Sequence, residues 1–326
     1  MNLYNSQKLL IEIPTWLGDT VMATPAIENL IEAINPKETA LIGNELSIKI
    51  FEHHPKIDKI FIDKSKKSKN RILSIYSLAK QIGPYDIAIS FRSHFFSKLL
   101  LYLTNSEKRY IYSAKKLNGL HQVERYNYFI NSILNKNLVA KNLKIYLSKT
   151  TFSFQHKKPI LGINPGATYG SSKRWPTSNF AKVAAHFSDR YFLIIFGSSN
   201  EIGISKEIEE ELKNMGIKNF INLTGKTTIE ELILNISNLD LFITNDSGPM
   251  HIAAAFKIPT VAIFGPTNPS ITSQWKNPKN KNIYLNLKCT PCMKRVCPLK
   301  HHKCMIDLTP FIVIEATEQL LKNSHL

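Results

Sequence analysis

The sequence predicts an α/β protein of two domains, each built on a mainly parallel sheet. Strand-length apolar runs alternate with helix-length amphipathic segments almost throughout the 326 residues, which is typical of βαβ units. Most of these runs hold several Ile, Leu or Val residues in succession, as strands buried on both faces require. A polar segment over 148–159 interrupts the alternation, and a second series of the same kind follows it.

The expected elements follow from that alternation. In the first half we expect strands over 8–13, 39–42, 58–62, 85–90 and 108–112, and helices over 25–34, 70–82, 95–104 and 121–135. In the second half we expect strands over 160–164, 191–196, 220–223, 241–244 and 260–264, helices between them, and a last helix over 310–322. We therefore place the domains at 1–155 and 156–326, with a cleft between them, and the last helix could pack on either domain.

Composition narrows the class of protein and of partner. An apolar content of 43% predicts real buried cores, and without an 18-residue apolar run or a signal-peptide pattern we expect a cytoplasmic protein. Because 42 Lys and Arg residues outnumber 25 Asp and Glu residues, anionic partners such as a phosphorylated substrate or an anionic membrane surface are favoured. The densest basic run, over 64–71, is either a solvated loop or a peripheral membrane contact. It has no interleaved aromatic residues or recognition motif, so we expect no nucleic acid.

The stretch 8-KLLIEIPTWLGDTVMATPAIENL-30 reads as a buried strand, a tight turn and a helix. Such a turn usually holds a nucleotide's phosphates, but here its single glycine, Gly18, precedes an acid, Asp19, that would repel a diphosphate. Asp19 either caps the following helix or lies free in the loop, because Thr24 and Pro25 offer a competing helix start.

A strand-to-helix turn in the second half, 241-LFITNDSGPMHIAAAF-256, predicts an anion site. Its helix is expected to begin near Ser247 to Pro249, with free backbone N–H groups and the positive end of the helix dipole at the sheet edge. Gly248 would let a ligand approach the backbone closely. The alternative is that Asp246 or Ser247 simply caps this helix.

A second turn, 160-ILGINPGATYGSSKRWP-176, is expected at the same edge. Its cations, Lys173 and Arg174, suit the negative charge that develops on a leaving diphosphate. A third loop, 197-GSSNE-201, offers groups for a ribose or base. No G-x-x-x-x-G-K-[ST] motif occurs, so kinase or ATPase chemistry is disfavoured.

Four segments, PTWLGDTVMATPAI, NPGATYGSSKRWP, TNDSGPMHIAAA and VAIFGPTNP, resemble the signature segments of the bacterial heptosyltransferases of glycosyltransferase family 9. The resemblance runs from residue 12 to about residue 305 and is greatest to the lipopolysaccharide heptosyltransferase II group. It implies a GT-B fold, with two Rossmann-like domains facing across a cleft.

The resemblance also implies a reaction and a place for it. Members transfer heptose, with inversion, from ADP-L-glycero-D-manno-heptose to the heptose of the inner core growing on Kdo-lipid A. This chain would then work as a cytoplasmic enzyme attached peripherally to the inner face of the cytoplasmic membrane. No cofactor would be required for the transfer.

Site residues are carried over where the motifs match. Asp19 would be the general base, and Gly18 would let the acceptor come close. The donor-binding residues implied by the matching motifs and the loops beside them are Thr168, Lys173, Arg174, Ser199, Glu201, Asp246, Ser247, Gly248 and His251. Family members often have a small apolar residue where Ser172 stands, a departure that leaves Lys173 in register.

The segment 90-SFRSHFFSKLL-100 is an acceptor-side candidate that follows a predicted strand. Arg92, Ser93 and Lys98 could bind phosphate or carboxylate groups of the acceptor. Equally, Arg92 and Lys98 could be surface charges that flank a helix whose Phe95, Leu99 and Leu100 pack inward.

All four cysteines lie in 289-CTPCMKRVCPLKHHKC-304. The C-x₂-C-x₄-C-x₆-C spacing of Cys289, Cys292, Cys297 and Cys304 is typical of a zinc or cluster site, whereas disulfides are less expected in a cytoplasmic protein. A structural zinc and reduced thiols in an ordered loop are the two alternatives.

Two other functions compete with the family reading. One is a different enzyme of the same fold, either a transferase for another nucleotide sugar or a sugar-nucleotide epimerase. The other is a metal- or nucleic-acid-binding module built on the basic surface and the cysteine segment.

Overall fold

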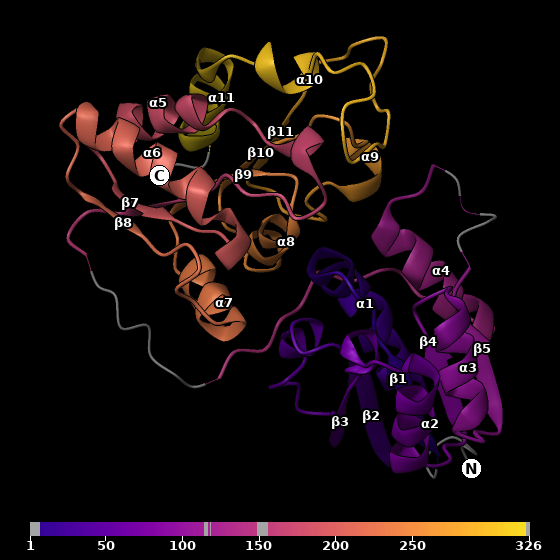
Figure 1. The fold of residues 1–326 in the computed structure, drawn as a ribbon. Helices are drawn as coiled ribbons and strands as arrows, with labels where there is room; N and C mark the ends of the chain where they lie inside the picture. Colours follow the sequence, from indigo (N-terminus) through magenta and orange to yellow (C-terminus); the bar gives the residue numbers. More distant parts are fainter. Residues whose placement is uncertain (1–6, 114–116, 118, 149–155, 324–326) are drawn as a thin grey trace. The chain divides into compact units, whose positions relative to one another are not determined.

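The computed structural model describes residues 7–113, 117, 119–148 and 156–323, and the chain divides into two compact units, residues 1–148 and 149–326 (Figure 1). The domain boundary that we placed after residue 155 follows 149–155, which lie outside the described residues. Each unit contains one parallel sheet with helices packed on it, so the predicted α/β class is confirmed.

The first unit contains a five-stranded parallel sheet in the order β3-β2-β1-β4-β5. Its strands are β1 (Lys8–Glu12), β2 (Glu38–Gly43), β3 (Lys59–Ile62), β4 (Ile87–Ser90) and β5 (Lys108–Ile111). Its helices are α1 (Leu17–Ile34), α2 (Arg71–Ile82), α3 (Phe95–Leu103) and α4 (Gln122–Leu134), with short 3₁₀ turns η1 (Ser47–Ile50) and η2 (Ser65–Lys67). All five predicted strands are confirmed.

Helices α2 and α3 pack together and against the first sheet, where Ile75, Leu78 and Leu100 meet strand residues Leu10 and Ala88. The Arg71 guanidinium lies 3.7 Å from the centre of the Phe96 ring and adds a cation–π contact between the two helices. Helix α1 packs against α4 instead. The sheet is therefore enclosed by helices, as its uninterrupted apolar strands predict.

Helix α1 begins eight residues earlier than the helix predicted over 25–34, at Leu17 rather than Pro25. Pro25 stands inside it, where the missing N–H would leave the Val21 carbonyl without its usual donor. The Thr24 hydroxyl donates to Val21 O at 2.8 Å and takes over that bond, and it accepts from Lys144 N at 3.0 Å. A local side-chain bond therefore lets the helix run through a proline that would otherwise end it.

The second unit contains a six-stranded parallel sheet in the order β11-β10-β9-β6-β7-β8. Its strands are β6 (Ile160–Asn164), β7 (Phe192–Ile195), β8 (Phe220–Asn222), β9 (Leu241–Asn245), β10 (Thr260–Ile263) and β11 (Asn280–Ile283). Its helical elements are η3 (Ser171–Lys173), α5 (Thr177–Phe187), η4 (Ser199–Glu201), α6 (Ile202–Asn214), α7 (Ile229–Ser237), α8 (Gly248–Ala255), α9 (Pro269–Thr272), α10 (Lys303–Ile306) and α11 (Pro310–Asn323).

Strand β11 was not predicted because its sequence, NKNI, holds one apolar residue. It is a partly exposed edge strand paired only to β10 within the described sheet, so no two-sided burial selects an apolar run. Helix α11 packs against α5, β10 and β11, and its Val313 and Leu320 join the core of the second unit. Of the two placements left open for the last helix, the structure shows the one on its own domain.

The order of the second sheet brings four loops to one edge. Strand β6 pairs with β7 on one side and β9 on the other, and β9 pairs with β10. Because all of these strands are parallel, the loops that follow β6, β7, β9 and β10 leave the same edge, and chain order reverses between β6 and β9. Ligands of open parallel sheets bind at such a switch point.

Two glycines of the second unit allow a matched test of its packing. A Cβ on Gly162 in β6 would lie 2.4 Å from Leu239 Cδ1 and 2.9 Å from Phe242 Cδ2, so we expect Gly162→Ala to destabilise the unit by about 1–3 kcal/mol. Gly203→Ala places its Cβ in open space on α6 and should stabilise by up to about 1 kcal/mol. Urea unfolding followed by circular dichroism measures both variants. Equal stabilities would contradict the packing described for β6.

Candidate active site

A buried ion pair forms the centre of the second unit's sheet edge. Lys173 Nζ, at the end of η3, lies 2.5 Å from Asp246 Oδ2, which directly follows β9. The two residues are 9% and 3% exposed, so the interaction is largely withdrawn from water. The Thr267 hydroxyl, from the loop after β10, donates to the same carboxylate oxygen at 2.6 Å. Asp246 therefore joins the loops that follow β6, β9 and β10.

Two buried asparagines at the ends of β6 and β9 hold the same loops. Asn245 Nδ2 donates to Pro165 O at 2.7 Å. Asn164 Nδ2 lies 3.1 Å from Ser247 Oγ and 3.2 Å from Thr244 Oγ1. Asn245 therefore links the end of β9 to the backbone of the loop after β6, and Asn164 links the end of β6 to side chains at the end of β9 and at the N-cap of α8.

Helix α8 begins at Gly248, directly after the ion pair, as predicted from the turn sequence. Ser247 occupies the N-cap position, but among the described residues no side-chain hydrogen bond caps this helix. The Asp246 carboxylate is held by Lys173 and Thr267, so neither acid nor serine caps the helix as the alternative interpretation required. The start of α8 therefore keeps backbone N–H groups and a positive dipole end suited to an anion.

The loop after β7 lies against the loop after β6. A Cβ added to Gly166 would stand 2.2 Å from the Glu201 carboxyl group, so a larger residue there would displace this carboxylate. Buried Glu201 also accepts hydrogen bonds from Ser198 N and Ser198 Oγ, both at 2.8 Å. The carboxylate is thereby fixed at the edge where we predicted adenosine contacts.

The remaining donor-side residues differ in exposure. Thr168, Arg174 and Ser199 have exposed side chains on the loops after β6 and β7, whereas His251 is buried within α8. The structure thus brings Lys173 and Asp246 into direct contact and leaves Arg174 as an exposed cation beside them. The predicted donor contacts of all these residues stay predictions.

Sequence reasoning missed Thr267, Asn164 and Asn245, which position the loops. Thr267 lies in the quoted GPTNP motif. Asn164 ends the apolar strand predicted over 160–164, and Asn245 directly follows the one predicted over 241–244. That change from apolar run to amide at a strand end is the signal that could have found them, because carboxyl ends of parallel strands carry ligand sites.

In the first unit, Asp19 is the third residue of α1 rather than part of a free loop. Its side chain is partly exposed, and an acid in the first helical turn is favoured by the helix dipole. Burial, and to a smaller degree the Asp19 charge, raises the pKa of Tyr112 and of Tyr126. The carboxylate therefore stands within electrostatic reach of two buried phenols, whose ring centres are 5.0 Å apart.

Arg92 follows β4 and is 9% exposed, so the interpretation of it as a surface charge is wrong. Its Nη1 lies 3.1 Å from Glu12 Oε1 and 3.2 Å from Asp63 Oδ2, and its Nε donates to Ile13 O at 2.7 Å. Burial raises the pKa of Glu12 more than the guanidinium lowers it. Burial alone would raise the pKa of Asp63 too, but hydrogen bonds from Ser65 and the Arg92 charge bring it below its usual range.

The other residues of this segment are on the surface. Ser93 and Lys98 are exposed, which fits either interpretation of them. Phe95 was expected to pack inward but is 68% exposed, because α3 buries the opposite face, with Ser97, Leu100 and Leu101. Leu100 packs inward as predicted.

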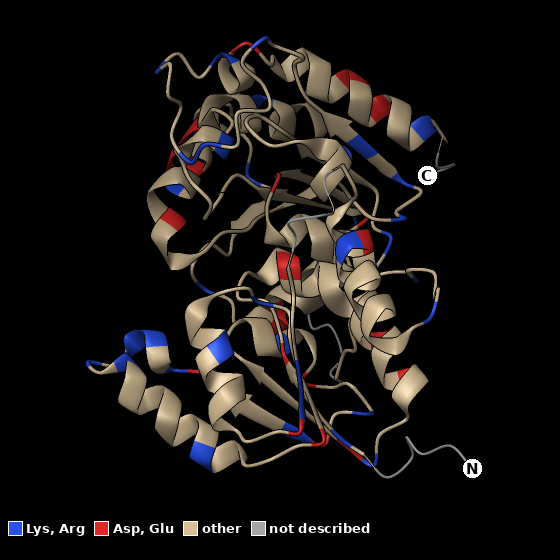
Figure 2. Ribbon diagram, turned by 90° about the vertical axis from the view of Figure 1, so that its right-hand side faces the viewer, with Lys and Arg blue, Asp and Glu red and all other residues tan. Residues whose placement is uncertain are grey.

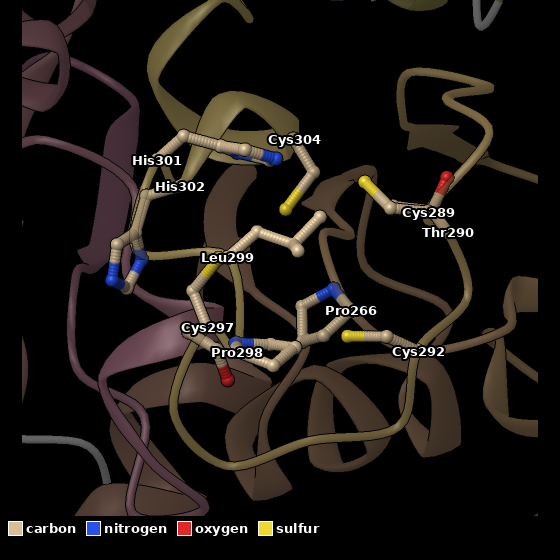
Figure 3. Close-up of a pocket in the computed structure, with 11 residues that line it drawn as sticks. Pro266, Cys289, Thr290, Cys292, Cys297, Pro298, Leu299, His301, His302 and Cys304 are labelled. Atoms are coloured by element: carbon tan, nitrogen blue, oxygen red, sulfur yellow. The ribbon is translucent and has the colours of Figure 1, made fainter.

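The four cysteines line one cavity of the second unit, together with His301 and His302 (Figure 3). All four are free thiols, and Cys304 is buried while the other three are partly exposed. Burial raises the pKa of Cys304 to about 11, and the three neighbouring cysteines add to the shift. Ser172 and Pro266, from the loops after β6 and β10, also line this cavity.

Basic side chains are spread over both units rather than gathered in one (Figure 2). Among the described residues, no helix is both long and apolar enough to cross a membrane.

Comparisons with known proteins agree with one another. The family model described as glycosyltransferase family 9 (heptosyltransferase) matches residues 75–303. Lipooligosaccharide heptosyltransferase 2 of Campylobacter jejuni is 45% identical over 323 residues, which cover 98% of this chain and 100% of the relative. The solved ADP-heptose lps heptosyltransferase II of E. coli has a TM-score of 0.80 at 24% identity and covers 98% of this chain and 100% of its own.

A second solved structure, a glycosyltransferase family 9 protein from Veillonella parvula, has a TM-score of 0.83 at 22% identity, with 99% of each chain covered. Structural likeness at this level of identity bears on the fold, which is the GT-B arrangement of two parallel sheets. The family match over most of the chain, together with the relative that is 45% identical over its full length, decides the assignment. The chain belongs to glycosyltransferase family 9, the heptosyltransferases, as the four sequence motifs predicted.

Proposed function

We propose that this enzyme transfers heptose from ADP-heptose to the heptose of a lipooligosaccharide inner core, as a heptosyltransferase of type 2. The observation that carries the proposal is full-length similarity to a lipooligosaccharide heptosyltransferase 2, and the buried Lys173–Asp246 pair at the expected sheet edge supports it. The 45% identity to a lipooligosaccharide heptosyltransferase 2 over the full chain favours this proposal over the competing epimerase and over a transferase for another nucleotide sugar.

The proposed base belongs to the first unit, and the residues proposed to bind the diphosphate belong to the second. An acceptor hydroxyl oxygen forms a bond to the anomeric carbon of heptose while the bond from that carbon to the diphosphate breaks. Asp19 takes the hydroxyl proton, and ADP leaves with the bonding electron pair. Lys173, Arg174 and the start of α8 stabilise the charge that develops on the diphosphate. A metal ion is not needed for any of these transfers.

Asp246 contributes to donor binding through Lys173. Its carboxylate accepts from both Lys173 and Thr267, so it orients the ammonium rather than meeting the diphosphate itself. An ammonium has three N–H donors. Lys173 Nζ donates to Asp246 Oδ2 at 2.5 Å and to Asp246 O at 3.4 Å, which leaves one donor for a phosphate oxygen. Donor recognition in this proposal therefore depends on a pre-positioned cation.

The direct test is to incubate the enzyme with ADP-heptose and a lipid A core that carries a single heptose. We expect a product heavier by one heptose together with released ADP, both read by mass spectrometry. ADP-heptose turnover without sugar addition, or addition only with a different nucleotide sugar, would favour one of the competing enzymes.

Peripheral attachment to an anionic membrane surface fits one face of the first unit. We define the α2–α3 surface by its exposed apolar residues Ile72, Leu73, Tyr76 and Phe95 and by exposed Lys66, Lys69 and Lys98. Helices α2 and α3 lie side by side, and η2 contacts α2. Exposed apolar side chains bordered by lysines suit a bilayer interface, where each lysine contributes about 1 kcal/mol.

Asp19→Asn removes the proposed base while keeping the size of the side chain. We expect turnover to fall about 10²- to 10⁴-fold, the usual contribution of a positioned base, with the melting temperature nearly unchanged. Glu32→Gln is the matched control, since Glu32 is a carboxylate on the same helix whose partner is Lys141. Near-normal turnover of Asp19→Asn would exclude it as the base.

Arg92→Met should first of all destabilise the first unit. Removing the guanidinium leaves Glu12 and Asp63 buried without their cation, which costs about 3–5 kcal/mol. Adding Glu12→Gln and Asp63→Asn should restore much of the stability. Thermal unfolding measures both effects, and a loss below about 0.5 kcal/mol in Arg92→Met, typical of a surface charge, would contradict the buried network.

The stabilised triple variant also tests acceptor binding. Arg92 Nη2 is buried with no hydrogen-bond partner among the residues described, and we assign it to an anionic group of the acceptor. With stability restored, the acceptor KM should rise while the donor KM stays constant. Unchanged KM values would limit Arg92 to a structural role.

Lys66→Ala with Lys69→Ala should weaken binding to anionic vesicles about tenfold or more, because two cations near the surface are lost. Leu73→Ser should weaken binding to the same vesicles through the apolar contact. Phe311→Ser, an exposed aromatic on α11 outside the α2–α3 surface, is the control. Co-sedimentation with vesicles measures all three, and equal binding by all variants would place any membrane contact elsewhere.

A further inference from the structure

The cysteine segment, residues 289–304, forms most of a long connection that lacks regular structure. No helix or strand is present over 284–302, and the exposed side chains include Met293, Val296 and Leu299. Irregular loops longer than about 12–15 residues are uncommon in compact domains unless they have a function of their own. This one places few of its side chains in a core, so contacts of another kind must order it.

Four thiols from this connection point to one place. Figure 3 shows Cys289, Cys292, Cys297 and Cys304 around a single cavity, with the Leu299 side chain among them. Cys289 and Cys292 come from one turn, Cys297 from the loop and Cys304 from α10. A pair in C-x₂-C spacing with two further cysteines is the ligand set of four-coordinate thiolate sites.

The loop between the second and third cysteines supports the donor site. Ser172 Oγ donates to Lys294 O at 2.6 Å, Ser172 N donates to Arg295 O at 3.2 Å, and Tyr169 Oη donates to Met293 O at 2.8 Å. A Cβ on Gly170 would lie 2.2 Å from Arg295 O, so the two backbones are in direct contact. Residues 293–295 therefore pack against the loop that carries Lys173 and hydrogen-bond to it.

The last cysteine is joined to the same place from the other side. Met305, directly after Cys304, packs so closely on Gly265 that an added Cβ would stand 2.4 Å from its sulfur. Met293 N also donates to Pro266 O at 2.8 Å. The cysteine cavity is therefore bordered by the loops after β6 and β10, the same two loops that Asp246 joins.

We propose that Cys289, Cys292, Cys297 and Cys304 bind one thiophilic divalent metal ion, Zn²⁺ or Fe²⁺, and that this ion holds residues 293–295 against the donor loop. Sulfur ligands select these metals over Mg²⁺ or Ca²⁺. The part of the proposal that concerns the donor rests on the proposed function, whereas metal binding does not.

Binding requires the thiols to close on the ion. Among the described residues, no group of three or more His, Cys, Asp or Glu side chains is already arranged to hold a metal ion. In a four-thiolate site the Zn–S distances are about 2.3 Å, so side-chain rotation must draw the sulfurs inward and move Leu299 out. His301 and His302 also border the cavity and are the competing ligands.

Metal content tests the site without donor or acceptor. Protein purified under reducing conditions without chelator should contain about one zinc or iron per chain by elemental analysis. Cys292→Ser and Cys297→Ser should each lose most of it, while the His301→Ala, His302→Ala double variant should keep it. Absence of metal in the parent, equal metal in the cysteine variants, or loss only in the histidine variant would overturn the proposal.

Cobalt gives a second readout that does not depend on variant folding. After chelation and dialysis, the parent protein should bind one Co²⁺ with strong thiolate-to-metal absorption in the near ultraviolet, and Zn²⁺ should displace it. Thiol titration of the native protein should find the three partly exposed cysteines, Cys289, Cys292 and Cys297, reactive before metal addition and few after it. Thiols that stay equally reactive after metal addition would argue against a thiolate site.

The link to the donor loop is measured as ADP affinity. Removing the metal should weaken ADP binding about tenfold or more, and re-addition should restore it. Ser172→Ala should weaken ADP binding with full metal content, since it breaks the contact to Lys294 but not the ligands. If ADP does not bind even the metal-loaded parent, the proposed function fails while the metal site stands. If ADP binds equally with and without metal, only the ion's link to the donor loop is refuted.

Discussion

The buried pair of Lys173 and Asp246 is the interaction that holds the loops at the carboxyl edge of the second sheet together. Loops after parallel strands have no ladder to hold them, and here one carboxylate joins three of them by accepting from Lys173 and Thr267. Both charges are withdrawn from water, so each requires the other: losing one partner would leave an uncompensated charge in the interior. A cation held in this way is placed before any anion arrives, which lowers the cost of ordering it on binding.

In the first unit, too, buried charges hold the carboxyl edge of the sheet, but there one arginine pairs with two carboxylates. At the carboxyl edge of its sheet, Arg92 after β4 is held by Glu12 at the end of β1 and by Asp63 beyond β3. There the carboxylates outnumber the cation, and burial keeps the pKa of Glu12 raised. In both units a buried cation connects the carboxyl ends of different strands of one sheet. The order of the strands brings the loops to one edge of the sheet, and the ion pairs fix the positions of those loops.

The parts of the fold that could be predicted are those for which the residue types along one short segment determine the structure. Two-sided burial makes β1 or β9 an apolar run, and Gly248-Pro249 after a strand marks the start of α8, so these were visible in the sequence. Strand β11 was not, because an edge strand needs no apolar run. The start of α1 was misplaced at Pro25, since the compensating bond from Thr24 to Val21 O has no signal in residue type alone.

Site residues follow the same division. Lys173, Asp246 and Glu201 could be named from their motifs, but the ion pair between the first two spans 73 residues of sequence. Arg92 was taken as a ligand contact or a surface charge because its partners Glu12 and Asp63 lie 80 and 29 residues away. Residue types show which groups are available, whereas only the order of strands in the sheet shows which of them meet.

The loop that carries Lys173 depends most strongly on residues that are distant in sequence. Apart from the short turn η3 it has no regular structure. Its backbone polar groups bond to distant parts of the chain: Pro165 O accepts from Asn245 Nδ2, and Ser172 N donates to Arg295 O. Its conformation is therefore determined by residues about 80 and 120 positions away rather than by its own motif. The same loop sequence without residues 293–295 would keep Lys173 and Arg174 but would lose the contacts that fix their positions. In the proposal made above, residues 293–295 take no part in the chemistry but determine how firmly the loop that carries Lys173 is held.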